Sequence, residues 1–248
     1  MICLNYYFIL RAYFYSCVQK IVVSIRFLCY NILHTSINNW ARKVGIVLTK
    51  NEIAESVFNK VGEIVKTDDF ISAGLTNYDV ARLCKQGAIE RIRNGFYQLS
   101  GNSEIKEEQL IAKLLPHGIV CVESALFHYG YSDFAPREWT IAVPRSFSRA
   151  IKKMNEVPVK AYYIQKEYYN LGRSSDVFNG VVLPIYDRER TICDCFKYRT
   201  RLDNELFNKA LNAYVTDERK NLSNLSQYAK KMHVYTKLMN VMEVLLNG

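Results

Sequence analysis

The chain has 248 residues, 49% of them hydrophobic, which is enough apolar content for two small cores. Its formal net charge is +9, but residues 1–50 hold six Lys/Arg and no Asp or Glu. Subtracting them from 33 basic and 24 acidic residues leaves 27 and 24, a net charge of only +3. This balance excludes a uniformly basic surface over the folded part, so any nucleic-acid surface must come from local placement of charge.

The cysteines and histidines form no metal or disulfide pattern. The seven cysteines are odd in number, make no CxxC pair and follow no cleavable signal sequence. They predict reduced thiols in the cytoplasm, with Cys84 and Cys121 buried as small hydrophobic side chains. Cys193-x-Cys195 lacks a nearby histidine set, so we expect no metal site and no cofactor.

Residues 1–49 form an apolar, basic leader. Arg11, Lys20 and Arg26 cut its apolar stretches well below the roughly 18–20 uncharged residues of a spanning helix. The basic region and cleavage site of a signal peptide are missing, and an interfacial helix with aromatic anchors is an alternative. We expect the leader to be disordered or foreign to the native product. The candidate start positions of the native product are Val44, Val47 and Leu48, near the end of this leader.

Residues 50–101 begin with the pattern of two helices. The first is expected over residues 49–65, capped by Thr49 or Asn51, because apolar residues recur there at three- and four-residue spacing. A second, short helix follows a cap at Thr67 and ends at Gly74, since glycine tolerates the left-handed backbone of a sharp stop. Leu75 is expected to fill the following turn with an apolar side chain.

A third helix and a hairpin complete this region. Thr76 caps the helix, which runs to about residue 86 before Gly87 stops it. Two β-prone runs, residues 88–93 and 96–99, flank Asn94-Gly95, which predicts a hairpin with a type I′ turn. Helix, turn, helix and hairpin is the layout of a winged helix-turn-helix, whose second helix lies in the major groove.

The third helix carries its apolar residues on one face and its polar residues on the other. Arginine and asparagine can read base edges, and lysine and arginine can bind phosphates. The candidate DNA-binding residues are Asn77, Tyr78, Arg82 and Lys85 for the major groove, and Arg91, Arg93 and Asn94 for the backbone or minor groove. The plain alternative is a small packing module without nucleic acid, because residues 51–100 hold six Lys/Arg and seven Asp/Glu.

Residues 104–248 predict a second, larger domain. Strands are expected at residues 119–122, 138–143, 159–164 and 181–186, and the pattern is helical from residue 188 to the end. Strands first and helices later indicate an α+β fold, a mixed α/β domain with a helical C-terminal part. A basic loop at residues 144–153 provides candidate phosphate contacts, with a solvated loop as the alternative. Its cations are Arg145, Arg149, Lys152 and Lys153.

The stretch DRERTICD, residues 187–194, holds three carboxylates and two arginines. One hypothesis is a metal-dependent nuclease that uses Asp187, Glu189 and Asp194. The favoured alternative is a helix start, with a capping box from Thr191 to Asp194 and an ion pair between Arg190 and Asp194. The sequence contains no P-loop, nucleophile elbow or glycine-rich dinucleotide turn, so we expect no catalytic residues.

Several motifs together resemble the AbiEi family of abortive-infection antitoxins. ISAGLTNYDVARLCKQGAIERIRNGFY resembles the family's N-terminal winged helix. SALFHYG, WTIAVPR, YDRERTICD and the terminal LMNVMEVLL follow in the family's order. The resemblance covers about residues 53–246, and the leader departs from the family pattern.

The resemblance implies a bacterial type IV antitoxin. In that family the winged domain represses its own operon by binding inverted repeats in operator DNA, and the C-terminal domain carries the antitoxic activity. The functional partner is an AbiEii-like nucleotidyltransferase toxin, without a stable complex between the two proteins. We therefore expect a cytoplasmic, non-enzymatic protein without membrane association. Its domains would be a leader (1–49), a winged helix (50–101) and an antitoxin domain (104–248). A module that binds the toxin directly is the remaining alternative.

Overall fold

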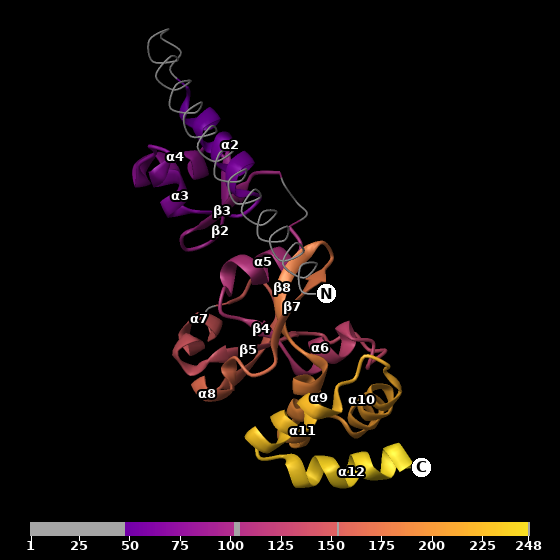
Figure 1. Ribbon diagram of the computed structural model, residues 1–248. Coiled ribbons are helices and arrows are strands. Elements are labelled where there is room, and N and C mark those ends of the chain that lie inside the picture. The colour runs from indigo at the N-terminus through magenta and orange to yellow at the C-terminus, as the bar shows by residue number, and fades with distance from the viewer. Residues whose placement is uncertain (1–47, 102–104, 153, 248) are drawn as a thin grey trace, which may run out of the picture. The chain divides into compact units, whose positions relative to one another are not determined.

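The computed structural model describes residues 48–101, 105–152 and 154–247 (Figure 1). The chain divides into two compact units, residues 1–56 and 57–248. The boundary falls inside α2 (Lys50–Val61), so nearly all described residues belong to the second unit. Residues 1–47 of the predicted leader lie outside the described residues, and the predicted domain limits stay a prediction. None of the helices in the described residues is long and apolar enough to cross a membrane.

The N-terminal helices largely match their predicted positions. Thr49 and Glu52 exchange main-chain to side-chain hydrogen bonds at the start of α2. The helix ends at Val61 and not at residue 65, because Gly62 adopts a left-handed φ of 106°. Two further helices follow, α3 (Thr67–Ser72) and α4 (Asn77–Lys85). The predicted cap at Thr67 is wrong: the N-cap of α3 is Lys66.

A three-stranded antiparallel sheet accompanies these helices. Its strands are β1 (Val65–Lys66), β2 (Ile89–Arg93) and β3 (Phe96–Leu99), in the order β1-β3-β2. Val65 pairs with Tyr97, and the ring of Phe70 from α3 lies edge-on to Tyr97 with centroids 5.8 Å apart. Phe70 and Leu75 are almost fully buried. The predicted order of helix, turn, helix and hairpin is therefore present.

The turn of this hairpin differs from the prediction. A type I′ turn needs a positive φ at both central residues. Gly95 has a φ of 83°, whereas Asn94 keeps a negative φ. The pairing register also shifts between Arg91 and Arg93. This irregularity contributes to the change of chain direction between β2 and β3, so Asn94 does not need a left-handed backbone.

A five-stranded mixed sheet forms the centre of the larger part, in the order β6-β5-β4-β8-β7. β4 runs parallel to β8, and β5 runs parallel to β6. The elements up to the last strand are α5 (Glu107–Leu114), β4 (Ile119–Val120), α6 (Val122–His128), β5 (Trp139–Pro144), η1 (Arg145–Phe147), α7 (Ser148–Lys152), β6 (Val159–Ile164), α8 (Lys166–Tyr169), β7 (Arg173–Phe178) and β8 (Val181–Tyr186).

Alternate residues of β4, β5, β6 and β8 enter two different cores. Val120, Ile141 and Ile185 pack on one face with residues of α5 and α7. Ile119 and Tyr186 pack on the other face with α9 and the helices that follow it. The sheet is therefore the middle of three layers, with helices on both faces.

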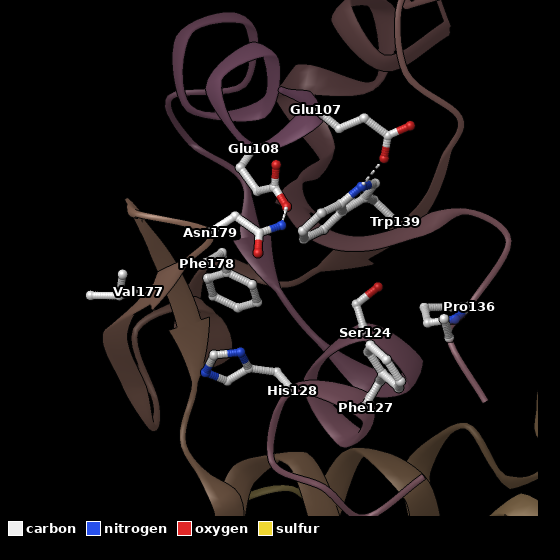
Figure 2. Close-up of a pocket in the computed structure, with 11 residues that line it drawn as sticks. Glu107, Glu108, Ser124, Phe127, His128, Pro136, Trp139, Val177, Phe178 and Asn179 are labelled. Carbon is white, nitrogen blue, oxygen red and sulfur yellow. Dashed lines mark hydrogen bonds between the residues drawn. The ribbon is translucent and has the colours of Figure 1, made fainter. Parts of the chain in front are cut away.

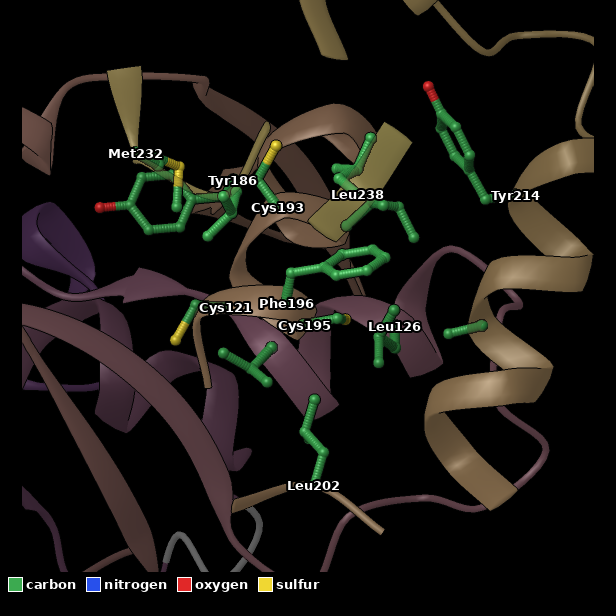
Figure 3. Packing of buried hydrophobic residues seen from close by; sticks show 14 of the residues in the cluster. Cys121, Leu126, Tyr186, Cys193, Cys195, Phe196, Leu202, Tyr214, Met232 and Leu238 are labelled. Atoms are coloured by element: carbon green, nitrogen blue, oxygen red, sulfur yellow. The ribbon is translucent and has the colours of Figure 1, made fainter. Parts of the chain in front are cut away.

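The C-terminal part is helical, as predicted. It consists of α9 (Arg188–Lys197), η2 (Arg199–Arg201), α10 (Asn204–Thr216), α11 (Leu222–Lys231) and α12 (Tyr235–Asn247). Figure 3 shows Phe196 of α9 among Leu126 of α6, Leu202 directly after η2, and Leu238 of α12. All four residues belong to one core cluster. Because α9 also packs against the sheet, it connects the helical part to the strands. The α+β fold class is confirmed.

Candidate nucleic-acid interface

α4 has a well-defined start and a buried inner face. The Thr76 hydroxyl accepts a hydrogen bond from the Asp79 amide, and the Asp79 carboxylate accepts one from the Thr76 amide at 2.9 Å. Val80 and Leu83 are buried at helical spacing. Gly87 has a φ of 73° and follows the C-cap, as the sequence predicted. The cap and the inner face fix which side of α4 meets solvent.

The outer face of α4 presents the predicted side chains. Asn77, Tyr78, Arg82 and Lys85 are all exposed, and Tyr78 is 75% exposed despite its aromatic ring. The one carboxylate of α4, Asp79, is buried in the cap. The charges on the exposed face are therefore both positive, although residues 51–100 as a whole are slightly acidic. This is the local asymmetry of charge that DNA binding requires.

The hairpin presents two of its three candidate residues to solvent. Arg91 and Asn94 are exposed, and the Arg91 guanidinium donates a hydrogen bond to the Asn94 side-chain carbonyl. Arg93 is half-buried, with its guanidinium 5.8 Å from the centroid of the Phe96 ring. Arg91 and Asn94 are thus available at the tip, whereas Arg93 is partly used in packing on its own strand pair.

The second basic segment is a short helix and not the expected loop. η1 and α7 cover it, and Arg145, Arg149 and Lys152 are exposed there. Lys153 lies outside the described residues. Their role as phosphate contacts stays a prediction.

The acidic stretch at the start of α9 is a buried network. Arg190 is fully buried, and its Nε donates to Asp194 at 3.1 Å, which confirms the predicted pair. Its Nη1 donates to the main-chain oxygens of Tyr168 and Leu171 at 2.7 and 3.0 Å. Its guanidinium also lies 4.3 Å from the centroid of the Tyr186 ring. Burial raises the pKa of Asp194, while the Arg190 charge opposes that rise.

The three carboxylates proposed for a nuclease have separate partners. Asp187 is the N-cap of α9 and accepts from the Arg190 amide at 2.8 Å, so the predicted Thr191–Asp194 capping box is wrong. Glu189 accepts a hydrogen bond from the Asn221 amide at 2.7 Å. Over the residues that the structure describes, no three His, Cys, Asp or Glu side chains converge as metal ligands. These contacts favour a structural role for the stretch.

The neighbouring Asp217 belongs to the same polar region. It accepts hydrogen bonds from the Tyr131 hydroxyl at 2.7 Å and from Arg188 Nε at 3.1 Å. Burial alone would raise its pKa, but hydrogen bonds from Tyr131 and Arg219 outweigh that effect and hold the pKa well below its usual value. This carboxylate therefore stays ionised and connects α9 to the turn after α10.

Comparison with known proteins agrees with the N-terminal geometry. The sequence model of a family described as "Transcriptional regulator, AbiEi antitoxin" matches residues 52–100. Those residues are therefore similar to the AbiEi antitoxin family. The AbiEi match covers the helices and the hairpin described above, and it confirms the resemblance over this segment. The resemblance of the later motifs to AbiEi stays a prediction.

The fold also has a counterpart among solved structures. The crystal structure of the RV2827C protein from Mycobacterium tuberculosis is similar with a TM-score of 0.51 and 15% sequence identity. The similarity covers 77% of this chain and 71% of that chain. At this identity the likeness concerns the fold alone. No curated protein compared with this chain gives a significant match.

The sequence did not predict one feature of the larger part. A cavity of about 440 Å³ lies between α5, α6 and the ends of β5 and β7. Glu107, His128 and Trp139 are among its lining residues. These three residues span 32 positions of the chain and belong to three different elements, α5, α6 and β5. No local spacing could have revealed them, because the pairing of β7 completes the cavity.

Proposed function

We propose that this protein is the antitoxin of a bacterial type IV toxin–antitoxin system and that it represses its own operon. The observation that supports this most directly is the AbiEi match over residues 52–100. The same residues form a capped helix with an exposed cationic face and an adjacent hairpin. A family model described as a transcriptional regulator thus coincides with the segment whose geometry suits duplex DNA.

In this proposal the segment acts as a winged helix. α4 enters the major groove, where Asn77 and Arg82 are suited to adenine and guanine edges, and Lys85 is suited to a phosphate. Arg91 and Asn94 at the hairpin tip contact the backbone or the minor groove. An operator of inverted repeats would bind two copies, each presenting one α4. Tyr78, which is exposed and aromatic, adds an apolar contact on the same face.

The larger part, residues 104–248, carries the antitoxic activity in this proposal. Its functional partner is an AbiEii-like nucleotidyltransferase toxin encoded beside it, without a stable complex. The protein acts in the cytoplasm and is not an enzyme. The contacts of Asp187, Glu189 and Asp194 support this, because each carboxylate already serves a cap, a main-chain amide or an ion pair.

A gel-shift titration with the operon's own promoter DNA tests the DNA-binding part. At fixed salt, Arg82→Ala should weaken specific binding by about 1–3 kcal/mol if Arg82 reads a base, a roughly 5- to 150-fold higher dissociation constant. Lys60→Ala on α2 is the matched control, because it also removes one exposed cation. Equal affinities of the Arg82 variant and the wild type would reject the assigned role of Arg82. If the wild-type protein shows no preference for the promoter over unrelated DNA, the proposal that it represses its own operon is rejected.

Co-expression with the neighbouring gene tests the antitoxic part. The full chain should restore growth of cells that express the toxin, and so should Arg82→Ala, because α4 has no part in neutralisation. A pull-down of the toxin by the tagged chain should recover no stable complex. Recovery of a stoichiometric complex would instead support the interaction-module alternative. Failure to restore growth would reject the antitoxin assignment.

A further inference from the structure

The cavity between α5, α6 and β7 has carboxylates on one side and aromatic rings along its wall. Figure 2 shows Glu107 and Glu108 with Trp139 and Asn179 on one side, and Phe127 and His128 on the opposite side. Its volume of about 440 Å³ lies within the usual range of ligand pockets, about 300–1,000 Å³. Ser124, Ala135, Pro136, Val177 and Phe178 complete the lining.

Both glutamates are held in place by side-chain hydrogen bonds. Glu107 accepts from the indole Nε1 of Trp139 at 2.7 Å, and Glu108 accepts from Nδ2 of Asn179 at 2.6 Å. Asn179 adopts a positive φ of 47°, which directs the turn after β7 toward α5. Each glutamate has a second carboxylate oxygen that these two bonds do not use. The carboxylates are therefore positioned, with capacity to accept further donors.

The aromatic wall is continuous. The His128 ring stacks on Phe178 with centroids 4.0 Å apart, and Phe178 lies 5.8 Å from Trp139. His128 Nε2 also lies 2.9 Å from the Asp176 carboxylate, and this hydrogen bond holds the pKa of Asp176 below its usual value. Among the described residues that line the cavity, the ionisable ones are Glu107, Glu108 and His128. The lining thus offers acceptors and ring faces, and it favours a cation.

Apolar side chains continue from the cavity onto the surface. Phe127 is 44% exposed and Val177 is 56% exposed, and both line the cavity. Val182, the ladder partner of Val177, is 64% exposed. Beside Ala135 and Pro136, Phe134 is 71% exposed. An apolar rim of this kind suits a protein partner more than a small free metabolite, because a small cation would leave the rim uncovered.

From these observations we infer that the cavity binds an arginine side chain presented by a partner protein. A planar guanidinium can donate to Glu107 and Glu108 while its face lies on an aromatic ring, a combination that a lysine ammonium provides less well. Arginine is also enriched among the residues that dominate binding at protein interfaces. The apolar residues next to that arginine would cover Phe127 and Val177. This inference does not depend on the proposed repressor or antitoxin function.

The test uses the full chain and small arginine probes followed by NMR. Acetyl-arginine amide should shift signals of the cavity residues with a dissociation constant on the order of 1 mM, as expected for a ligand of its size. Acetyl-citrulline amide has nearly the same shape without the charge and should bind at least roughly tenfold more weakly. Acetyl-Val-Arg-Val amide should bind several-fold more tightly than acetyl-arginine amide, because its flanks reach the apolar rim.

Two variants separate the cavity from the general surface charge. Glu107→Gln keeps an acceptor for Trp139 but removes the charge, and it should weaken the arginine probes at least roughly fivefold. Glu138→Gln removes the same charge from an exposed residue beside Trp139 and should change nothing. Unchanged unfolding midpoints establish that both variants fold. Equal binding of citrulline, shifts outside the cavity, or no effect of Glu107→Gln would overturn the inference. Equal affinity of acetyl-arginine amide and acetyl-Val-Arg-Val amide would overturn the inference that the arginine is presented by a partner protein.

Discussion

Arg82 on α4 and Arg190 on α9 show two opposite uses of the same side chain. Both helices begin with a side-chain cap, Thr76 for α4 and Asp187 for α9. Arg82 is exposed, whereas Arg190 is fully buried beside Asp194. The difference lies in what surrounds each helix. One face of α4 remains in water, whereas α9 is enclosed by the sheet and the helical part.

This difference has an energetic consequence. An exposed arginine keeps its hydration and costs little to remove, so it is available for an anionic partner. A buried guanidinium must satisfy its donors inside the protein, because an unpaired charge there is very costly. Substitutions in the two regions should therefore affect different measurements. Substitutions on the outer face of α4 should change binding, and substitutions around Arg190 should change stability.

The largest expected effect is on stability at Arg190. Arg190→Met leaves the Asp194 carboxylate buried without its partner and removes two hydrogen bonds to main-chain oxygens. We expect a loss of about 3–5 kcal/mol in the free energy of unfolding, measured by urea denaturation. The same substitution at Arg82 is the control and should change stability by less than about 0.5 kcal/mol. Similar losses at both positions would remove the distinction between the two helices.

A second test concerns the space around Arg190. Gly172 has a φ of 67°, and a methyl group there would lie 2.5 Å from Cβ of Arg190 and 2.9 Å from the Asp187 carboxylate. Gly172→Ala should destabilise the protein by about 2–4 kcal/mol through backbone strain and overpacking. Gly180→Ala is the matched control, because Gly180 also has a positive φ but open space around it. It should cost about 1 kcal/mol. Thermal or urea unfolding that gives equal losses would contradict the close approach.

The sequence predicted the exposed helix better than the buried one, and the reason is physical. The cap at Thr76, the stops at Gly74 and Gly87, and the outward face of α4 follow from local rules of spacing and backbone conformation. On α9 the predicted capping box at Thr191 was wrong, because Asp187 is the N-cap and Thr191 lies inside the first turn, where its hydroxyl donates to the Tyr186 carbonyl at 3.3 Å. Asp187 and Thr191 are both possible caps in the same short stretch, and the end of β8 at Tyr186 places the start of the helix at the first of them.

The same limit explains the missed strand β7. Its sequence, RSSDVF, is mostly polar and carries no alternation that predicts a strand. Its pairing with β8 creates it, and only Phe178 is buried. Since β7 supplies one wall of the acidic and aromatic cavity, the cavity could not be predicted either. The candidate residues on α4 were predictable because one helix holds all of them.

A smaller effect is expected at the cap of α4. Thr76→Ala removes the acceptor for the Asp79 amide and one partner of the Asp79 carboxylate. It should cost about 1 kcal/mol of stability, the usual cost of losing an N-cap. Because the cap fixes the start of α4, promoter binding should weaken as well. Thr76→Ser keeps the hydroxyl and should behave like the wild type in both assays. A stability loss without any change in promoter affinity would contradict the proposal that α4 binds DNA.

The smallest expected effect is on the salt dependence of DNA binding. If Lys85 contacts a phosphate, Lys85→Ala should weaken promoter and unrelated DNA alike. It should also reduce the slope of log affinity against log salt by about 1. Lys231→Ala removes an exposed cation from the end of α11 and should leave the slope unchanged. If both variants lower the slope equally, net charge and not the face of α4 controls binding, and the contrast between α4 and the rest of the chain would lose its functional meaning.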